Sequence, residues 1–209
     1  MGQTMIVPSA RAVSMIVGFE VGDAQAYIPH PIWPGGASGL TIGVGYDLGY
    51  ASAAQIANDW HVLSEPVIHR LQIYAGIFGH AAAGLLPQAR DIEVPYNAAL
   101  GVFEGTDVPR TSKVTSDIFA NCNQISADSF GALVSLVFNR GPSMIDTQPN
   151  ANRLEMRQIR DAMASAKFQE VPGFIRSMKR IWHNAGLPGL LARRDAEAQL
   201  FEEGLPENR

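Results

Sequence analysis

Only one cysteine, Cys122, occurs in the 209 residues, and the lack of a second thiol excludes an internal disulfide. Apolar runs are short, and none approaches the roughly 20 residues that a membrane-spanning helix needs. We therefore predict no stable membrane insertion. Charged residues are scarce, at 17%, which favours a compact globule over a disordered chain. A net charge of −4 gives no support for nucleic-acid binding, which normally needs a basic surface.

Motifs for several classes of chemistry are also missing. The five histidines are scattered, with no HExxH and no Cys/His pairs, so surface or hydrogen-bonded histidines are expected and no metal site. The chain lacks both GxSxG and the Walker motif GxxxxGKS/T. Gly43-x-Gly45 follows an apolar run, but Leu48 stands where a dinucleotide loop needs its third glycine. Asp47 would also place negative charge where pyrophosphate sits, so no cofactor is predicted.

Hydrophobic spacing and turn residues indicate a chain that is mostly helical. Short β-branched runs among glycines and prolines predict a β-hairpin lobe over about 21–50. The remainder, about 51–203, reads as a helical lobe on which the hairpin lobe packs, and we expect a monomeric α+β, mostly α, single domain over 1–209. The expected helices start near Ser9, Ser52, Ser64, Val94, Ser126, Arg153, Val171 and Leu190; residues 105–125 are expected to be loop-rich, and Asp195, Glu197, Glu202 and Glu203 to point outward.

Two acids flank the predicted hairpin lobe. Glu20 stands where the first helix ends, and Asp47 and Thr41 lie on the hairpin. Glycosidic hydrolysis needs an acid that protonates the leaving oxygen and a second group that holds water or stabilises positive charge. The sequence leaves a plain alternative for each residue: a solvated helix-end acid, a turn former and a β-branched strand residue.

Four segments carry a more specific signal in their order and spacing. They are Phe19-Glu20, the run Thr41-Ile42-Gly43-Val44-Gly45, "ALVSLVFNRG" at 132–141 and "GLLARRDAEAQLF" at 189–201. Together they resemble the phage-type lysozymes, which are endolysin muramidases of tailed phages and their bacterial relatives. The resemblance implies a lysozyme-like fold and hydrolysis of the β-1,4 bond between N-acetylmuramic acid and N-acetylglucosamine.

The resemblance also implies roles for the acids. Glu20 corresponds to the general acid, and Thr41 to the residue that positions the attacking water. Many members carry an Asp or Cys shortly before the Thr, which this chain lacks; pesticin-like members place the acid six residues after it, on Asp47. Asp47 would then assist as base or electrostatic stabiliser. Tyr46 stands where the family often has His.

Four further residues are expected to bind substrate. Asn139 would hydrogen-bond sugar groups from the end of its helix, and Tyr46 follows the glycine motif. Arg194, or Arg193, would lie near Glu20 and hold it, the alternative being a solvated helix face. Trp33 would stack on a sugar ring or cover the lobe's core. The acidic net charge would be offset by a locally positive cleft, supplied by Arg and Lys of the last third.

The expected partner is the peptidoglycan glycan strand. Two other functions stay open: a non-catalytic peptidoglycan-binding module of lysozyme fold, or a hydrolase of chitin or chitosan. The N-terminus has no signal-peptide pattern. We therefore expect synthesis in the cytoplasm and action in the periplasm or on the wall, after delivery by a holin or a secretion system. In the second case an immunity protein or a secretion-system spike would be a further partner.

Overall fold

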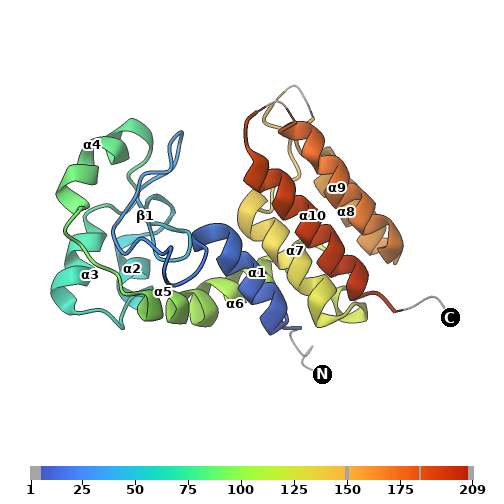
Figure 1. The fold of residues 1–209 in the computed structure, drawn as a ribbon, viewed down its shortest axis with the longest axis horizontal. Coiled ribbons are helices and arrows are strands. Elements are labelled where there is room, and N and C mark those ends of the chain that lie inside the picture. Colours follow the sequence, from blue (N-terminus) through green and yellow to red (C-terminus); the bar gives the residue numbers. More distant parts are fainter. Residues whose placement is uncertain (1–5, 149–150, 184, 207–209) are drawn as a thin grey trace. The chain divides into compact units, whose positions relative to one another are not determined.

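The computed structural model describes residues 6–148, 151–183 and 185–206 (Figure 1). It is mostly helical, with one small antiparallel sheet in the described part of the chain, so the predicted α+β, mostly α class is confirmed. The chain divides into two compact units. The first takes in the described chain up to Phe19 and again from Val108 onward, and the second runs from Glu20 to Asp107.

The first unit is built from long helices. Its centre is α7, where Ser126 caps the first turn by accepting a hydrogen bond from the Ser129 amide at 3.1 Å. The sequence predicts an apolar stripe of Phe130, Leu133, Val134, Val137 and Phe138 on this helix; the first four are buried and Phe138 is half-buried. Helix α7 ends before Gly141, which has φ +71°. The helices that contribute to this unit are α1 (Ala10–Val21), α6 (Val108–Ile118), α7 (Ala127–Arg140), α8 (Leu154–Ala164), α9 (Val171–Ser177) and α10 (Pro188–Glu203), with 3₁₀ turns at Cys122–Gln124, Phe168–Glu170 and Met178–Ile181.

The helices of the first unit pack closely, with α10 in contact with two others and small residues where α1 meets α7. Helix α10 packs against both α7 and α9, and α6 and α8 pack against α7 and α9 respectively. A Cβ placed on Gly131 of α7 would overlap the Cβ of Ala12 on α1, so glycine permits the two helices to approach closely. Ser9 caps α1, as predicted, by accepting from the Ala12 amide at 3.1 Å.

The second unit combines the hairpin with short helices. Strands β1 (Thr41–Ile42) and β2 (Tyr46–Asp47) pair antiparallel, and Ile32 bridges Thr41 on the other side. The predicted lobes, about 21–50 and about 51–203, do not coincide with the observed units, because the hairpin belongs with the helices that follow it. Those elements are a 3₁₀ turn at Leu48–Tyr50, α2 (Ala53–Asp59), α3 (Glu65–Gln72), α4 (Gly79–Ala89), α5 (Tyr96–Val102) and a π-helical turn at Phe103–Asp107.

The expectation of a loop-rich segment at 105–125 was wrong, because α6 occupies most of it. Its inward-facing positions include Ser112 and Thr115, both buried. Because the buried positions of α6 include these small polar residues and Pro109 stands in its first turn, the sequence lacks the apolar residues at helical spacing from which a helix is predicted. Helix α4 was not predicted either, since its buried residues are alanines and it contains Pro87.

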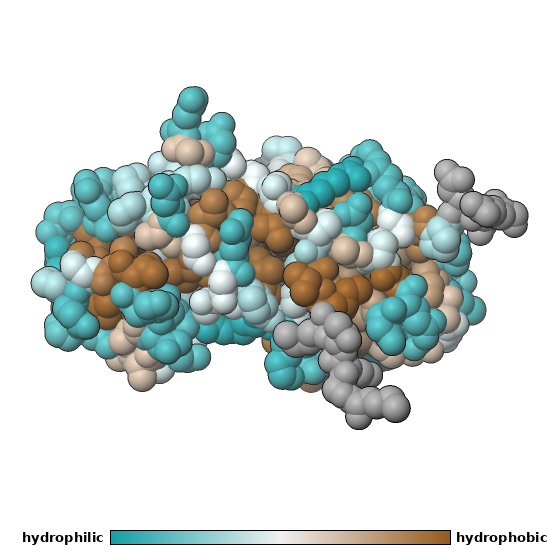
Figure 2. Space-filling view, turned by 90° about the horizontal axis from the view of Figure 1, so that it is seen from below, coloured by the Kyte–Doolittle hydropathy of each residue, from teal (hydrophilic) through white to brown (hydrophobic). Residues whose placement is uncertain are grey.

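The described residues contain no helix long and apolar enough to cross a membrane. On the face drawn in Figure 2, hydrophobic patches are interrupted by hydrophilic side chains. Single exposed apolar residues are normal on protein surfaces.

Candidate active site

The turn of the glycine-rich hairpin depends on two glycines with positive φ. The three-residue loop between Ile42 and Tyr46 needs positive φ at Gly43 (+57°) and Gly45 (+77°), which glycine adopts without strain. A Cβ on Gly43 would also lie 2.6 Å from Cη2 of Trp60, whose ring is fully buried. Glycine at this position therefore lets the hairpin loop lie directly against the core of the second unit.

A pocket of about 350 Å³ opens beside this hairpin, entirely within the second unit. Glu20 and Thr41, both half-buried, line it, and so does His30. Much of the remaining lining is apolar, including Val21, Ala26, Ile28, Ile32 and Ile42. Pockets of about 300–1,000 Å³ with apolar walls and a few polar groups are typical of small-ligand sites. We call this the hairpin pocket.

Two local features of the fold position Glu20 and Thr41: the end of α1 and the β pairing of Thr41. Glu20 lies in the last turn of α1, and Gly22 ends the helix with φ +74°. Thr41 is held on both sides, because its backbone exchanges hydrogen bonds with Ile32 (2.8 and 3.0 Å) and its strand pairs with β2. Thr41 therefore occupies the middle position of a three-segment β arrangement, where its backbone is fixed.

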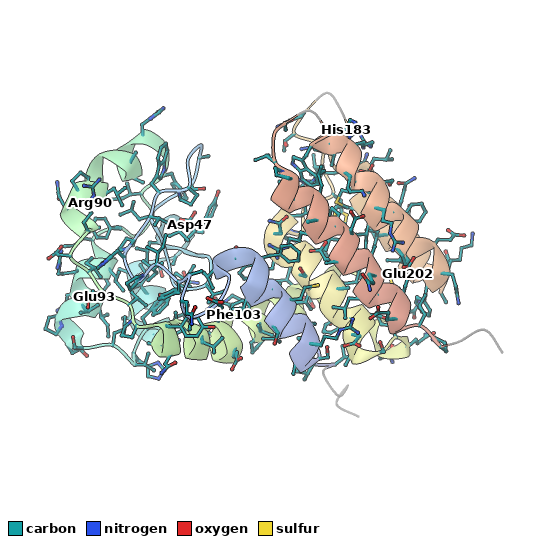
Figure 3. All side chains as sticks on the ribbon, viewed as in Figure 1. Asp47, Arg90, Glu93, Phe103, His183 and Glu202 are labelled. Atoms are coloured by element: carbon teal, nitrogen blue, oxygen red, sulfur yellow. The ribbon has the colours of Figure 1, made fainter. Side chains whose placement is uncertain are left out.

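Asp47, labelled in Figure 3, does not line the hairpin pocket. Its carboxylate accepts hydrogen bonds from the Gly39 amide (3.1 Å to each oxygen) and the Gly49 amide (2.8 Å). It caps the 3₁₀ turn at Leu48–Tyr50 and joins the two ends of the hairpin. Partial burial raises the pKa of Asp47, and the two amide hydrogen bonds oppose that rise. These contacts give the carboxylate a structural task.

Tyr46 and Trp33 also lie outside the pocket lining. Tyr46 is buried; its hydroxyl donates to Asp59 at 2.9 Å, and its ring meets Trp60 edge-on at 5.4 Å. Trp33 is half-buried, and its indole N–H donates to the Ser38 carbonyl at 3.0 Å. Its ring lies 6.0 Å from that of His80. For Trp33 these contacts favour the covering of the lobe over stacking on a sugar.

The two remaining predicted binding residues belong to the first unit. Asn139 is exposed in the last turn of α7. Arg194 is completely buried, so the alternative of a solvated helix face was wrong. Its guanidinium donates to Glu197 at 2.7 Å and lies over the ring of Trp182, 5.8 Å from the centroid. Substrate binding by Asn139 and a role for Arg194 beside Glu20 stay predictions.

Glu197 was expected to point outward, and that prediction was wrong, because its side chain is fully buried. One carboxylate oxygen accepts from Ser135 (2.6 Å), Arg193 (3.2 Å) and Arg194 (2.7 Å). Arg193 in turn lies over the ring of Phe19, 5.7 Å from its centroid. We call Ser135, Arg193, Arg194 and Glu197 the buried ion cluster. A charge inside a core is tolerated when opposite charges and hydrogen bonds surround it.

Among the described residues of the last third, three basic side chains that reach solvent contact carboxylates. Arg176 forms an ion pair with Glu202, which Figure 3 labels on α10. The ammonium of Lys179 lies 2.7 Å from Asp195, and Arg180 forms an ion pair with Glu155. The positive charge that was expected to attract an anionic wall is therefore locally offset.

His30 is the pocket residue that sequence reasoning missed. Nδ1 of its ring lies 3.0 Å from the Ile92 carbonyl oxygen, so the histidine has a hydrogen-bond partner as expected. The residue also belongs to the pocket lining with Glu20 and Thr41. The only signal in the sequence was its position between the two, because a lone histidine has no ligand or nucleophile pattern around it.

The chain matches no protein-family model, and no curated protein matches it.

Proposed function

We propose that this chain is a peptidoglycan hydrolase, a muramidase that cleaves the β-1,4 bond between N-acetylmuramic acid and N-acetylglucosamine. The observation that carries the proposal is that Glu20 and Thr41, far apart in sequence, line one largely apolar pocket. A carboxyl group against apolar walls is the setting in which an acid can donate a proton to a leaving oxygen. The four ordered segments that resemble phage-type lysozymes add the substrate class.

In the proposed mechanism Glu20 and Thr41 have separate roles in the pocket, and Asp47 has a structural role outside it. Glu20 protonates the glycosidic oxygen as the bond to the anomeric carbon breaks. Thr41, held by its backbone pairing, orients the water that attacks that carbon. Asp47 keeps the hairpin in shape through Gly39 and Gly49 and does not reach the sugar. The protein acts in bacterial cell-wall lysis, as a phage endolysin or an antibacterial effector, in the periplasm or on the wall after delivery.

The test is release of reducing ends from purified peptidoglycan by the wild type and by Glu20→Gln, with the products identified by mass spectrometry. Products ending in muramic acid from the wild type, and a loss of at least about 10²-fold in the variant, support the proposal. Products ending in glucosamine, or cleavage of chitin or chitosan in preference to peptidoglycan, would replace the substrate with another glycan.

A second candidate is a non-catalytic module that binds peptidoglycan. The contacts of Asp47 favour it, since the described pocket lining contains Glu20 as its only carboxylate. Folded wild-type protein that sediments with cell walls and releases no reducing ends would establish this alternative. Cleavage by the wild type would exclude it.

A further inference from the structure

The hairpin pocket holds a second ionisable side chain that the proposed mechanism has not used. Among the described residues that line it, Glu20 and His30 are the two that can carry charge. The carboxylate expected to complete the pair, Asp47, is absent from the lining and is bound by the Gly39 and Gly49 amides. If hydrolysis occurs in this pocket, the group that activates water has to come from what lines it.

The hydrogen bond of His30 defines which ring nitrogen is available. A carbonyl oxygen can only accept, so contact between Nδ1 and the Ile92 carbonyl at 3.0 Å places the proton of the neutral ring on Nδ1. Nε2 then carries the lone pair. The same bond fixes the rotation of the ring, as the orienting partner of a catalytic histidine does. His30 is thus prepared to accept a proton through Nε2.

We infer that His30 is the catalytic base of the hairpin pocket, a role that rests on the proposed glycosidase function. Nε2 takes a proton from the attacking water while the water oxygen bonds to the anomeric carbon. The glycosidic C–O bond breaks, its electrons go to the leaving oxygen, and Glu20 gives that oxygen its proton. The products are a new hemiacetal, a free hydroxyl, an imidazolium and a carboxylate, and return of the proton from the imidazolium to Glu20 restores the enzyme.

This mechanism fixes the stereochemistry of the product. Water activated by a base attacks from the face opposite the leaving group, so the configuration at the anomeric carbon inverts. Hydrolysis of a β bond then gives the α-anomer first. The new reducing end can be followed by proton NMR during cleavage of a soluble peptidoglycan tetrasaccharide by the wild type. This readout needs no variant and therefore does not depend on the folding of one.

The variant that isolates the base is His30→Asn. The asparagine amide can donate to the Ile92 carbonyl in place of Nδ1–H, while nothing replaces Nε2. The matched control is His61→Asn, since Nδ1 of His61 also lies 2.8 Å from a backbone carbonyl, that of Asn58, but the residue is exposed and outside the pocket. We expect His30→Asn to lower kcat by about 10²–10⁴-fold with KM little changed and the melting temperature kept. Added imidazole should restore part of the activity of His30→Ala.

The outcomes distinguish a failure of the role of His30 from a failure of the proposed muramidase function. An inverted product and a folded, inactive His30→Asn variant support His30 as the base. A retained product, or full activity in folded His30→Asn, overturns the role of His30 and leaves the muramidase proposal standing. A wild type that releases no reducing ends from peptidoglycan overturns both.

Discussion

The two units place their polar groups in opposite ways. The first unit buries an ion cluster, in which Glu197 accepts from Arg193, Arg194 and Ser135 with none of them near solvent. The second unit keeps Glu20, His30 and Thr41 partly accessible around a pocket. Charge that is enclosed by partners within a core serves structure, whereas charge that faces a pocket can meet a ligand. The contrast gives the ion cluster a structural role, and the proposed function places its chemistry in the hairpin pocket of the second unit.

The same contrast appears between two carboxylates within the second unit. Glu20 lines the hairpin pocket, and Asp47 binds backbone amides at the base of the hairpin. Both are half-buried acids close to the predicted site. What separates them is the set of groups that each one faces, which spacing along the chain does not define.

The largest effect on stability is expected from breaking the buried ion cluster. Glu197→Gln removes the negative charge that faces Arg193 and Arg194, and such a loss costs about 3–5 kcal/mol in the free energy of unfolding. Denaturant unfolding followed by circular dichroism measures it. Glu202→Gln is the control, because its ion pair with Arg176 is exposed and is worth less than about 1 kcal/mol. Equal effects of the two substitutions would contradict the structural role of the cluster.

A smaller loss is expected from filling the glycine turn of the second unit. Gly43→Ala combines strain at positive φ with contact against Trp60, and we expect a loss of about 2–4 kcal/mol. Gly36→Ala shares a positive φ (+59°) but meets nothing within 4 Å, so it should cost only about 1–2 kcal/mol. Thermal unfolding of both variants measures the difference. A Gly43→Ala variant no less stable than Gly36→Ala would show that the loop does not press on the Trp60 ring.

The effect of Asp47 on stability should depend on pH. Asp47→Ala leaves two amides without their acceptor, which costs about 1–3 kcal/mol. Because burial raises the pKa of Asp47, the folded wild type binds this proton more tightly than the unfolded chain does. The wild type therefore loses stability relative to Asp47→Ala as pH rises from the ordinary value of 3.8 through the folded pKa. Unfolding at pH 3 and pH 6 measures the sign, and a growing advantage of the wild type at pH 6 would contradict it.

The smallest expected signal is the reactivity of the single thiol. Cys122 is buried and its Sγ–H contacts the Phe119 carbonyl at 3.2 Å; burial raises the pKa of the thiol to about 11. Labelling with a thiol reagent at pH 8 should therefore be slow in the native protein and become fast only when the first unit opens. Glu197→Gln should accelerate labelling more than Gly43→Ala does, since Cys122 belongs to the first unit. Fast labelling of the native wild type would contradict this account of the thiol.

The sequence predicted those parts of the fold whose signals lie in neighbouring residues. The Ser126 cap with its apolar stripe predicted α7, and Thr41-Ile42-Gly43-Val44-Gly45 predicted the hairpin, because caps and turns depend on neighbouring residues. The burial of Glu197 was not predictable in this way. It depends on Ser135, 62 residues away, and an acid on a helix reads as solvent-facing until its partners are known.

The candidate site was likewise predictable only in part. Glu20 and Thr41, which the sequence placed in one candidate site, both line the hairpin pocket, and their catalytic roles stay predictions. The sequence did not show that Asp47 binds the Gly39 and Gly49 amides, because this contact depends on the turn of the chain after Thr41. It also did not show that His30 lines the pocket, because that depends on the path of the chain before Thr41. A hydrogen bond to Ile92, 62 residues along the chain, orients the His30 ring and has no counterpart in the spacing.

The central claim is that chemistry belongs to the pocket carboxylate and structure to the hairpin carboxylate. The most direct test compares kcat for peptidoglycan cleavage in the wild type, Glu20→Gln and Asp47→Asn, each confirmed as folded by circular dichroism. We predict a loss of at least about 10²-fold for Glu20→Gln and a rate for Asp47→Asn within about fivefold of the wild type, a factor worth about 1 kcal/mol. A folded Asp47→Asn variant as inactive as Glu20→Gln, or a fully active Glu20→Gln variant, would contradict the account.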